Sequence, residues 1–264
     1  MIDIRSLSKY FHRGSVNEVL ALSGIDLKVR AGDFITLVGS NGAGKSTLLN
    51  CIAGSYPVDG GRIHIDDVDV TGWPEHRRAG LISRVFQDPL LGTCGSLSIE
   101  QNLALASRRG QSHGLGWGVR RSDRELFRER LSLLGLGLEN RLRDQVGMLS
   151  GGQRQALTLL MATLVRPAVL LLDEHTAALD PKTALQVLEL TEKLVGELQL
   201  TTLMVTHNMR QALQLGNRLV MMHAGRVILD VSGAEKEAMR VEDLLERFYS
   251  VRGEAFDSDR MLLV

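Results

Sequence analysis

The eight residues GSNGAGKS, at positions 39–46, constrain the fold of this chain more than any other stretch. They match the pattern G-x-x-x-x-G-K-[ST] and stand between an apolar run, DFITLVG at 33–39, and a helix-like segment, STLLNCIAG at 46–54. Glycines in such a loop let backbone N–H groups surround phosphate oxygens, and the N-terminus of the following helix adds positive charge. The sequence therefore predicts a nucleotide-binding phosphate loop in an α/β fold.

Two side chains of this loop have distinct predicted tasks. Lys45 reaches the outer phosphates of the nucleotide, and the Ser46 hydroxyl ligates Mg²⁺. The loop residues predicted to contact the nucleotide are Gly39, Ser40, Asn41, Gly42, Ala43, Gly44, Lys45, Ser46 and Thr47.

An acidic segment, AVLLLDE at 168–174, complements the loop. A buried strand that ends in Asp173 places a carboxylate beside the metal, and Glu174 is predicted to be the general base that orients a water. Taken alone, an Asp-Glu pair after a strand is as well explained by the start of a loop. The phosphate loop in the same chain favours the catalytic interpretation.

The segment LSGGQRQALTLL, at 149–160, begins a helix in an unusual way. Ser150 suits an N-cap, but two glycines in the first turn cost about 1 kcal/mol each in helix propensity. The phosphate loop and the acidic strand already account for one nucleotide. The amides, the hydroxyl and the helix dipole at this point therefore predict a second anion site, suited to a γ-phosphate.

This segment resembles the signature of ATP-binding cassettes, the ATPase subunits of ABC transporters, and the resemblance extends over residues 2–233. In that family, the signature of one subunit closes over the ATP bound by the phosphate loop of another. The resemblance implies a P-loop NTPase (RecA-like) core and a head-to-tail homodimer that encloses two ATP molecules with Mg²⁺. The residues then expected to contact the partner's nucleotide are Ser150, Gly151, Gly152 and Gln153.

Further motifs of the family follow one another along this chain in the same order as in the family. Gln87, in VFQDP, matches the glutamine that touches Mg²⁺ and the attacking water, and Asp180 matches the loop that lines the dimer contact. His207, at the end of the strand-like TTLMVTH, matches the histidine that hydrogen-bonds the γ-phosphate. Phe11 matches the aromatic that stacks on adenine, with Tyr10 as a rival and simple packing as the alternative for both. The expected catalytic residues are Lys45, Gln87, Glu174 and His207.

The alternation of strand-like and helix-like segments predicts a mainly parallel sheet covered by helices, with an N-terminal antiparallel β subdomain and an α-helical insert. The expected single nucleotide-binding domain (1–264) consists of a catalytic core with the β subdomain (1–87 and 153–233), a helical subdomain (88–152) and a short C-terminal extension (234–264).

Several local features refine this expectation. GGRIHIDDVDV, at 60–70, has the alternation of a strand, and a hairpin is predicted to turn at Ala224 and Gly225. Two capping boxes are expected in the insert, from Ser98 with Gln101 and from Ser122 with Glu125.

Composition bears on partners and location. Lys and Arg number 31, as do Asp and Glu, so the net charge gives no argument for a nucleic-acid partner. Cys51 and Cys94 suit a reducing cytosol and are expected to be small buried or half-buried hydrophobes. No apolar run approaches the roughly 20 residues that span a bilayer, and the first residues lack the apolar stretch of a signal peptide. We therefore expect a peripheral protein on the cytoplasmic face of the inner membrane.

The resemblance implies integral membrane permease subunits as partners. In the family, a short permease helix docks in a groove between the helical insert and the loop of Gln87, and residues 87–102 match that region. Leu90 and Leu91 are candidates for the apolar contact, with ordinary packing as the alternative. Arginines around 114–118 would meet lipid headgroups or the permease, or simply form a solvated face.

At closer range, stretches such as VGSNGAGKSTLLNCIAGSYPVDGG and LLLDEHTAALDPKTA resemble a bacterial subgroup of cassettes for aromatic amino-acid uptake, which work with a periplasmic or lipoprotein substrate-binding protein. The roughly thirty residues after Gly233 are too few for an appended regulatory domain. The alternatives are an exporter ATPase and a non-transport cassette such as an iron–sulfur assembly protein. A nucleotide sensor without turnover is disfavoured because Glu174 and His207 are both present.

Overall fold

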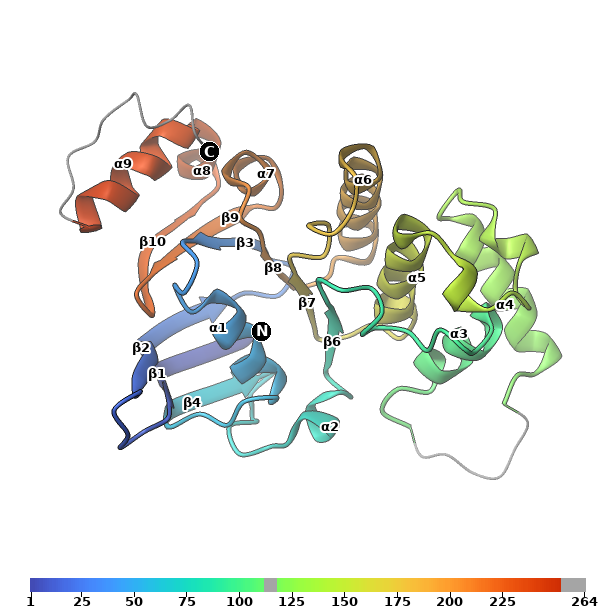
Figure 1. Ribbon diagram of the computed structural model, residues 1–264, viewed down its shortest axis with the longest axis horizontal. Coiled ribbons are helices and arrows are strands. Elements are labelled where there is room, and N and C mark those ends of the chain that lie inside the picture. The colour runs from blue at the N-terminus through green and yellow to red at the C-terminus, as the bar shows by residue number, and fades with distance from the viewer. Residues whose placement is uncertain (112–117, 253–264) are drawn as a thin grey trace.

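The computed structural model describes residues 1–111 and 118–252, and within them the strands form two sheets (Figure 1). The larger sheet is mainly parallel, the smaller is antiparallel, and helices cover them, as the sequence predicts. Helices α3 to α5 gather at the end of the molecule away from the antiparallel sheet (Figure 1).

The larger sheet carries the strands expected to lead into the site. Its order is β10 (Arg226–Ser232), β9 (Arg218–His223), β3 (Phe34–Gly39), β8 (Thr202–Val205), β7 (Val169–Asp173) and β6 (Ile82–Val85). Neighbours from β9 to β6 are parallel, and β10 is antiparallel to β9. The predicted hairpin between β9 and β10 is confirmed: Ala224 and Gly225 have φ values of 45° and 74°. Because β3, β7 and β8 are parallel, their carboxyl ends meet at one edge of the sheet.

The smaller sheet has the order β2 (Val19–Val29), β1 (Ile2–Phe11), β4 (Gly60–Ile65) and β5 (Val68–Asp69). The strand alternation expected over 60–70 is confirmed, and the segment folds back on itself as a hairpin of two strands. Asp66 and Asp67 form the turn with φ values of 47° and 64°. Aspartate tolerates this left-handed conformation better than most residues, so two in succession favour a turn over a continuous strand.

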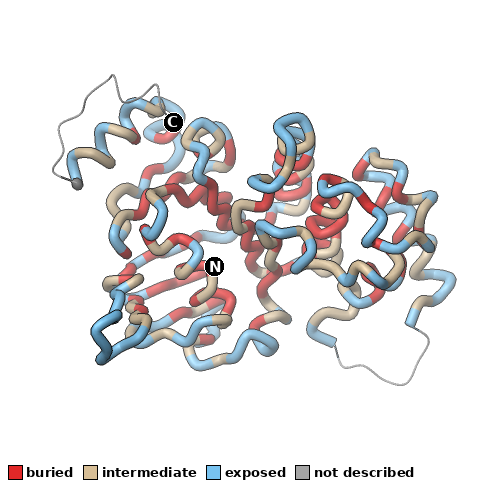
Figure 2. Tube along the Cα trace, viewed as in Figure 1, coloured by how far each residue is buried: buried red, intermediate tan, exposed pale blue. Residues whose placement is uncertain are grey.

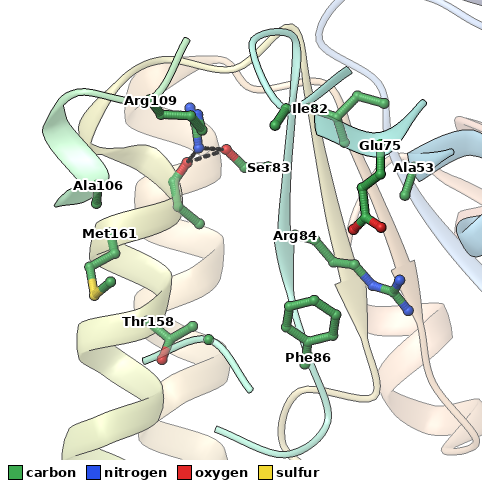
Figure 3. A pocket seen from close by; sticks show the side chains of 13 residues that line it. Ala53, Glu75, Ile82, Ser83, Arg84, Phe86, Ala106, Arg109, Thr158 and Met161 are labelled. Carbon is green, nitrogen blue, oxygen red and sulfur yellow. Dashed lines mark hydrogen bonds between the residues drawn. The ribbon is translucent and has the colours of Figure 1, made fainter. Parts of the chain in front are cut away.

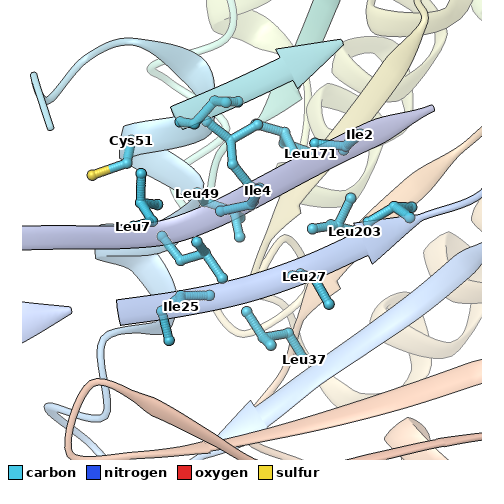
Figure 4. Packing of buried hydrophobic residues seen from close by; sticks show 14 of the residues in the cluster. Ile2, Ile4, Leu7, Ile25, Leu27, Leu37, Leu49, Cys51, Leu171 and Leu203 are labelled. Carbon is cyan, nitrogen blue, oxygen red and sulfur yellow. The ribbon is translucent and has the colours of Figure 1, made fainter. Parts of the chain in front are cut away.

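Helix α1 (Lys45–Ala53) lies between the two sheets and contributes to the main apolar core. Figure 4 shows Leu49 and Cys51 of this helix packed with Leu7, Leu171 and Leu203. Burial raises the pKa of the Cys51 thiol to about 11, so this residue behaves as a small hydrophobe, as expected.

Cys94 departs from that expectation, because it is exposed. It lies in the loop before α3, where its backbone N–H donates to Oδ1 of Asn102 at 2.8 Å. Its thiol lies 3.4 Å from the hydroxyl of Ser96. The backbone contact holds this loop on the surface, which leaves the Cys94 side chain outside the core.

The insert forms α3 (Ile99–Ser107), α4 (Arg121–Ser132) and the first part of α5 (Gly151–Leu164), around an apolar cluster of its own that includes Leu103, Phe127 and Leu157. The capping box of Ser98 and Gln101 is confirmed. The box expected from Ser122 and Glu125 is wrong, because α4 begins at Arg121. The backbone N–H of Arg120 donates to the Asp123 carboxylate at 2.8 Å, and this charged acceptor fixes an earlier start.

The remaining α-helices are α2 (Glu75–Arg78), α6 (Pro181–Leu198), α7 (Met209–Gln214), α8 (Ala234–Ala238) and α9 (Val241–Arg252), and two short 3-10 helices are η1 (Leu138–Asn140) and η2 (Val146–Met148). Leu188, Leu194 and Val195 of α6 pack in one cluster with Leu170 of β7 and Met204 of β8. Figure 2 shows the strands of the larger sheet as the most continuously buried part of the chain. Within the described residues, no helix combines the length and apolar composition needed to cross a bilayer.

Candidate functional site

The phosphate loop joins β3 to α1 and is pressed closely against neighbouring strands. Gly39 and Gly44 have φ values of 149° and 98°, in a region that other residues rarely adopt. A Cβ atom at Gly39 would lie 2.1 Å from the carbonyl oxygen of Met222, and one at Gly44 would lie 2.6 Å from that of Ala21. The two glycines are therefore required by the packing of the loop as well as by its backbone conformation.

Lys45 lies inside the curve of this loop. Its Nζ donates to the carbonyl oxygens of Gly39 at 2.8 Å and Ser40 at 3.0 Å, and the residue is 6% exposed. Burial lowers the pKa of Lys45, and the nearby carboxylates of Glu174 and Asp173 oppose that shift. The ammonium group thus stands at the place where the loop would hold the outer phosphates.

The Asp173 carboxylate, at the end of β7, has a partner on each of its oxygens. Oδ1 accepts from the Ser46 hydroxyl at 3.3 Å, and Oδ2 accepts from Nη2 of Arg84 at 2.7 Å. A hydroxyl and a carboxylate oxygen at this separation are a donor set that Mg²⁺ accepts, with its remaining positions filled by water and phosphate. The residues present therefore fit the expected cation.

Arg84 is a site neighbour that the sequence analysis missed. Its Nη1 donates to Oδ1 of Asn50 on α1 at 2.6 Å, so the guanidinium connects α1 to β7. One signal for it was present: a charged residue between Ser83 and Val85 in the short strand β6 needs a partner when the strand is buried. The sequence did not indicate which acidic residue that partner would be.

Glu174 and His207 approach each other at the carboxyl edge of the larger sheet. Nδ1 of His207 lies 3.6 Å from Oε2 of Glu174. Glu174 has a φ of 46°, which is strained for a residue with a long side chain, and its N–H donates to the carbonyl of Val205 at 3.1 Å. His207 lies two residues beyond the end of β8 rather than on the strand, and 64% of its side chain is exposed. A cavity of about 160 Å³ is lined by both residues.

His175, to which the sequence analysis assigns no chemistry, lines the same cavity. It is 2% exposed, and its Nε2 is 3.0 Å from the hydroxyl of Thr191 on α6. Burial lowers the pKa of His175 to about 4. The ring is therefore neutral at physiological pH, and it connects the loop after β7 to α6.

The signature segment begins α5 with the predicted Ser150 cap. The Ser150 hydroxyl accepts from the N–H of Gln153 at 3.3 Å, and Oε1 of Gln153 accepts from the N–H of Ser150 at 3.2 Å. A Cβ atom at Gly152 would lie 2.0 Å from Cγ2 of Thr183 on α6, whereas one at Gly151 would meet only Leu179, at 3.4 Å. Gly152 is thus needed for the close packing of α5 on α6, a reason within the chain that the sequence analysis did not identify.

Asp180 caps the neighbouring helix. Its Oδ1 accepts from the N–H of Thr183 at 3.1 Å, and hydrogen bonds from the Thr183 side chain and from this N–H lower the pKa of the Asp180 carboxyl. The signature and Asp180 therefore lie together at the start of α5 and α6.

In Figure 1, α5 and α1 lie on opposite sides of β6 and β7. One chain thus presents two separate groups of predicted site residues, one at the phosphate loop and one at the signature.

The two aromatic candidates both have partners within the chain. The Phe11 ring meets the Tyr56 ring edge-on, with centroids 5.4 Å apart. The guanidinium of Arg13 lies 5.0 Å from the centroid of Tyr10. Gln87 is exposed in the loop after β6. The roles of these three residues stay predictions.

A cavity of about 260 Å³ lies between the main sheet and the helical insert. Figure 3 shows Glu75, Arg84 and Phe86 on one side of it, and Ala106 and Met161 on the other. In the loop after β6, Leu90 and Leu91 are 57% and 69% exposed. The predicted arginine-rich contact around 114–118 falls largely outside the described residues.

Comparison with known proteins gives a consistent set of matches. Residues 22–177 match the sequence profile of the ABC transporter family. A tyrosine transport ATP-binding protein of Clostridioides difficile is 48% identical over 250 residues, which are 94% of this chain and 98% of that protein. A methionine import ATP-binding protein of Rhizobium johnstonii is 35% identical over 214 residues, which are 79% of this chain and 56% of that protein. A solved dimeric ATP-binding cassette in a post-hydrolysis state, bound to ADP and phosphate, is 27% identical with a TM-score of 0.74, and the match covers 88% of this chain and 98% of that one.

Proposed function

The chain belongs to the ABC transporter family of ATP-binding cassettes, and on this premise we propose that it is the ATP-hydrolysing subunit of an importer for tyrosine or a related aromatic amino acid. The observation that carries the choice of substrate is the 48% identity to a tyrosine transport ATP-binding protein along 98% of its length. The observation that supports hydrolysis is the meeting of Lys45, Asp173 and Glu174 at one edge of the sheet.

In this proposal Lys45 binds the outer phosphates, and Ser46, Asp173 and Gln87 hold Mg²⁺. When bound, the cation supplies positive charge that offsets the negative charge of the phosphates. Glu174 accepts a hydrogen bond from a water and aligns it with the γ-phosphate. His207, whose Nδ1 is 3.6 Å from Oε2 of Glu174, donates a hydrogen bond to the same γ-phosphate.

We further propose that two chains complete each other's sites. The separation of the signature from α1 within one chain supports this, because Ser150 and Gly151 then have a ligand only across a dimer. The apolar cluster of α3, α4 and α5, which continues past residue 152 to Leu157 and Leu160, supports a helical subdomain that can turn relative to the core when the dimer closes.

The proposal places the chain at the cytoplasmic face of the membrane, held there by permease subunits and working with a substrate-binding protein. The exposed Leu90 and Leu91, beside the 260 Å³ cavity, support a docking surface for the permease.

The hydrolysis cycle is tested by Glu174→Gln, which keeps the side-chain shape but removes the base. We expect this variant to bind ATP, to hydrolyse it at least 100-fold more slowly and to elute as a dimer from a sizing column in the presence of ATP. A variant that stays monomeric in ATP would overturn the dimer scheme.

The transport assignment is tested by purifying the cassette with its membrane partners and reconstituting the complex in liposomes. We expect a multi-spanning membrane protein to co-purify, and ATP hydrolysis to rise with tyrosine-loaded binding protein more than with the methionine-loaded form. Co-purification of a soluble scaffold instead would favour the iron–sulfur assembly alternative.

A further inference from the structure

The Arg84 side chain joins three elements that carry different parts of the proposed site. Arg84 lies on β6, three residues before Gln87. Its Nη1 donates to Oδ1 of Asn50 on α1, the helix that follows the phosphate loop, at 2.6 Å. Its Nη2 donates to Oδ2 of Asp173 at the end of β7, at 2.7 Å. One guanidinium therefore bridges the helix of the loop and the predicted metal ligand.

The surroundings of Arg84 restrict its motion. Its side chain is 12% exposed and that of Asp173 is 14% exposed, so water competes little for their contact. The guanidinium also lies 4.7 Å from the centre of the Phe86 ring, and Figure 3 shows the two side chains beside each other. A planar group with two acceptors and an aromatic neighbour has one well-defined position.

This arrangement assigns different tasks to the two oxygens of Asp173. Oδ2 is held by Arg84, which leaves Oδ1 facing the Ser46 hydroxyl at 3.3 Å. Mg²⁺ requires nearly ideal octahedral geometry, so its binding depends on the rotation of a ligating carboxylate. We propose that Arg84 is a positioning residue that fixes the Asp173 carboxylate with Oδ1 directed at the cation site.

The inference rests on the proposed function, because it takes Asp173 as a ligand of the cation. Arg84 also has an effect opposite to orientation of the carboxylate, because its positive charge repels a cation bound nearby. The two effects predict opposite results when Arg84 is replaced. If orientation dominates, loss of Arg84 weakens cation binding; if charge repulsion dominates, the loss tightens it.

The test measures cation affinity directly, with Mn²⁺ as a paramagnetic probe titrated into the protein–ADP complex and free Mn²⁺ followed by electron paramagnetic resonance. We expect Arg84→Met to weaken Mn²⁺ binding about tenfold, the low end of the loss for a hydrogen bond to a charged group. Arg84→Lys is expected to give an intermediate loss of Mn²⁺ affinity, because a single ammonium group replaces a planar guanidinium that donates to both Asn50 and Asp173. Asn50→Ala removes one anchor and is expected to give a smaller loss in the same direction.

Two controls separate positioning from general damage. ADP affinity in EDTA is expected to be the same in the Arg84 variants and the wild-type chain, because Arg84 contacts no residue of the phosphate loop itself among the described hydrogen bonds. Arg124→Met removes a comparable ion pair, 2.7 Å from Nε of Arg124 to Oε2 of Glu100 in the helical insert, and is expected to leave Mn²⁺ affinity unchanged.

Each outcome decides between explanations. Unchanged or tighter Mn²⁺ binding in Arg84→Met overturns the inference. If Arg84→Met loses ADP binding in EDTA, then Arg84→Lys and Asn50→Ala carry the test, and wild-type Mn²⁺ affinity in both overturns it. A wild-type protein that binds no ADP contradicts the proposed function instead.

Discussion

The Nδ1 atom of His207 lies 3.6 Å from the Oε2 atom of Glu174, at the point where the loops after β8 and β7 come together. The two residues are separated along the chain by the whole of α6 and β8, and only the parallel pairing of β7 with β8 brings them to one edge. This contact places a hydrogen-bond donor beside the predicted general base.

We predict that His207→Ala retains ATP binding but hydrolyses ATP about 100-fold more slowly, because the γ-phosphate loses a donor next to Glu174. Hydrolysis is measured by phosphate release and binding by fluorescent ATP. His207→Gln, whose side-chain amide still offers N–H donors, is the matched variant and should recover part of the rate. Equal rates in His207→Ala and the wild-type chain would show that the contact has no catalytic role.

We predict that Gly152→Ala destabilises the fold by about 1–2 kcal/mol, because the added Cβ would overlap Cγ2 of Thr183 and the strain exceeds the gain in helix propensity. Denaturant unfolding measures the effect. Thr183→Ser removes the opposing methyl group, so the double variant should recover the stability lost. Gly151→Ala, whose Cβ would meet Leu179 only at 3.4 Å, should not destabilise the fold and should raise its stability by up to about 1 kcal/mol through helix propensity.

His175 predicts a pH dependence of stability. Its pKa is lowered from 6.5 to about 4 in the folded chain, so the unfolded chain takes up a proton that the folded chain does not as the pH falls through this range. The free energy of unfolding should therefore decrease from pH 6.5 toward pH 4, by on the order of 3 kcal/mol from this group.

Calorimetry in EDTA without nucleotide checks this dependence. His175→Gln, which stays neutral and keeps a partner for Thr191, should show a shallower decline over the same pH range. An equally steep decline in the variant would assign the effect to other groups.

We predict that Leu91→Glu weakens docking of the permease without changing the stability of the fold. Because Leu91 is 69% exposed, the substitution should change the free energy of unfolding by less than about 0.5 kcal/mol. It should nevertheless reduce the amount of permease that co-purifies, since a charge would enter an apolar contact. Leu185→Glu is the matched control on α6, where the residue is 59% exposed, and should leave co-purification intact.

Features that depend on neighbouring residues could be predicted from the amino-acid sequence. The phosphate loop, the strand that ends at Asp173, the caps at Ser98 and Ser150 and the hairpin at Ala224 follow from local hydrogen bonds and backbone preferences within a few residues. The one misplaced capping box, at Ser122, shows the limit of such rules where two acceptors, a hydroxyl and the Asp123 carboxylate, compete within one turn.

Contacts between residues that are distant in the chain could not be predicted in this way, because they depend on the packing of the whole fold. The bond from Arg84 to Asp173, the overlap that requires Gly152 beside Thr183, and the division of the predicted site between α1 and α5 each join segments far apart in the chain. Such contacts arise from the order of strands in a sheet and the packing of helices on one another. No local preference specifies them, because a side chain's choice of partner depends on which element the fold places beside it.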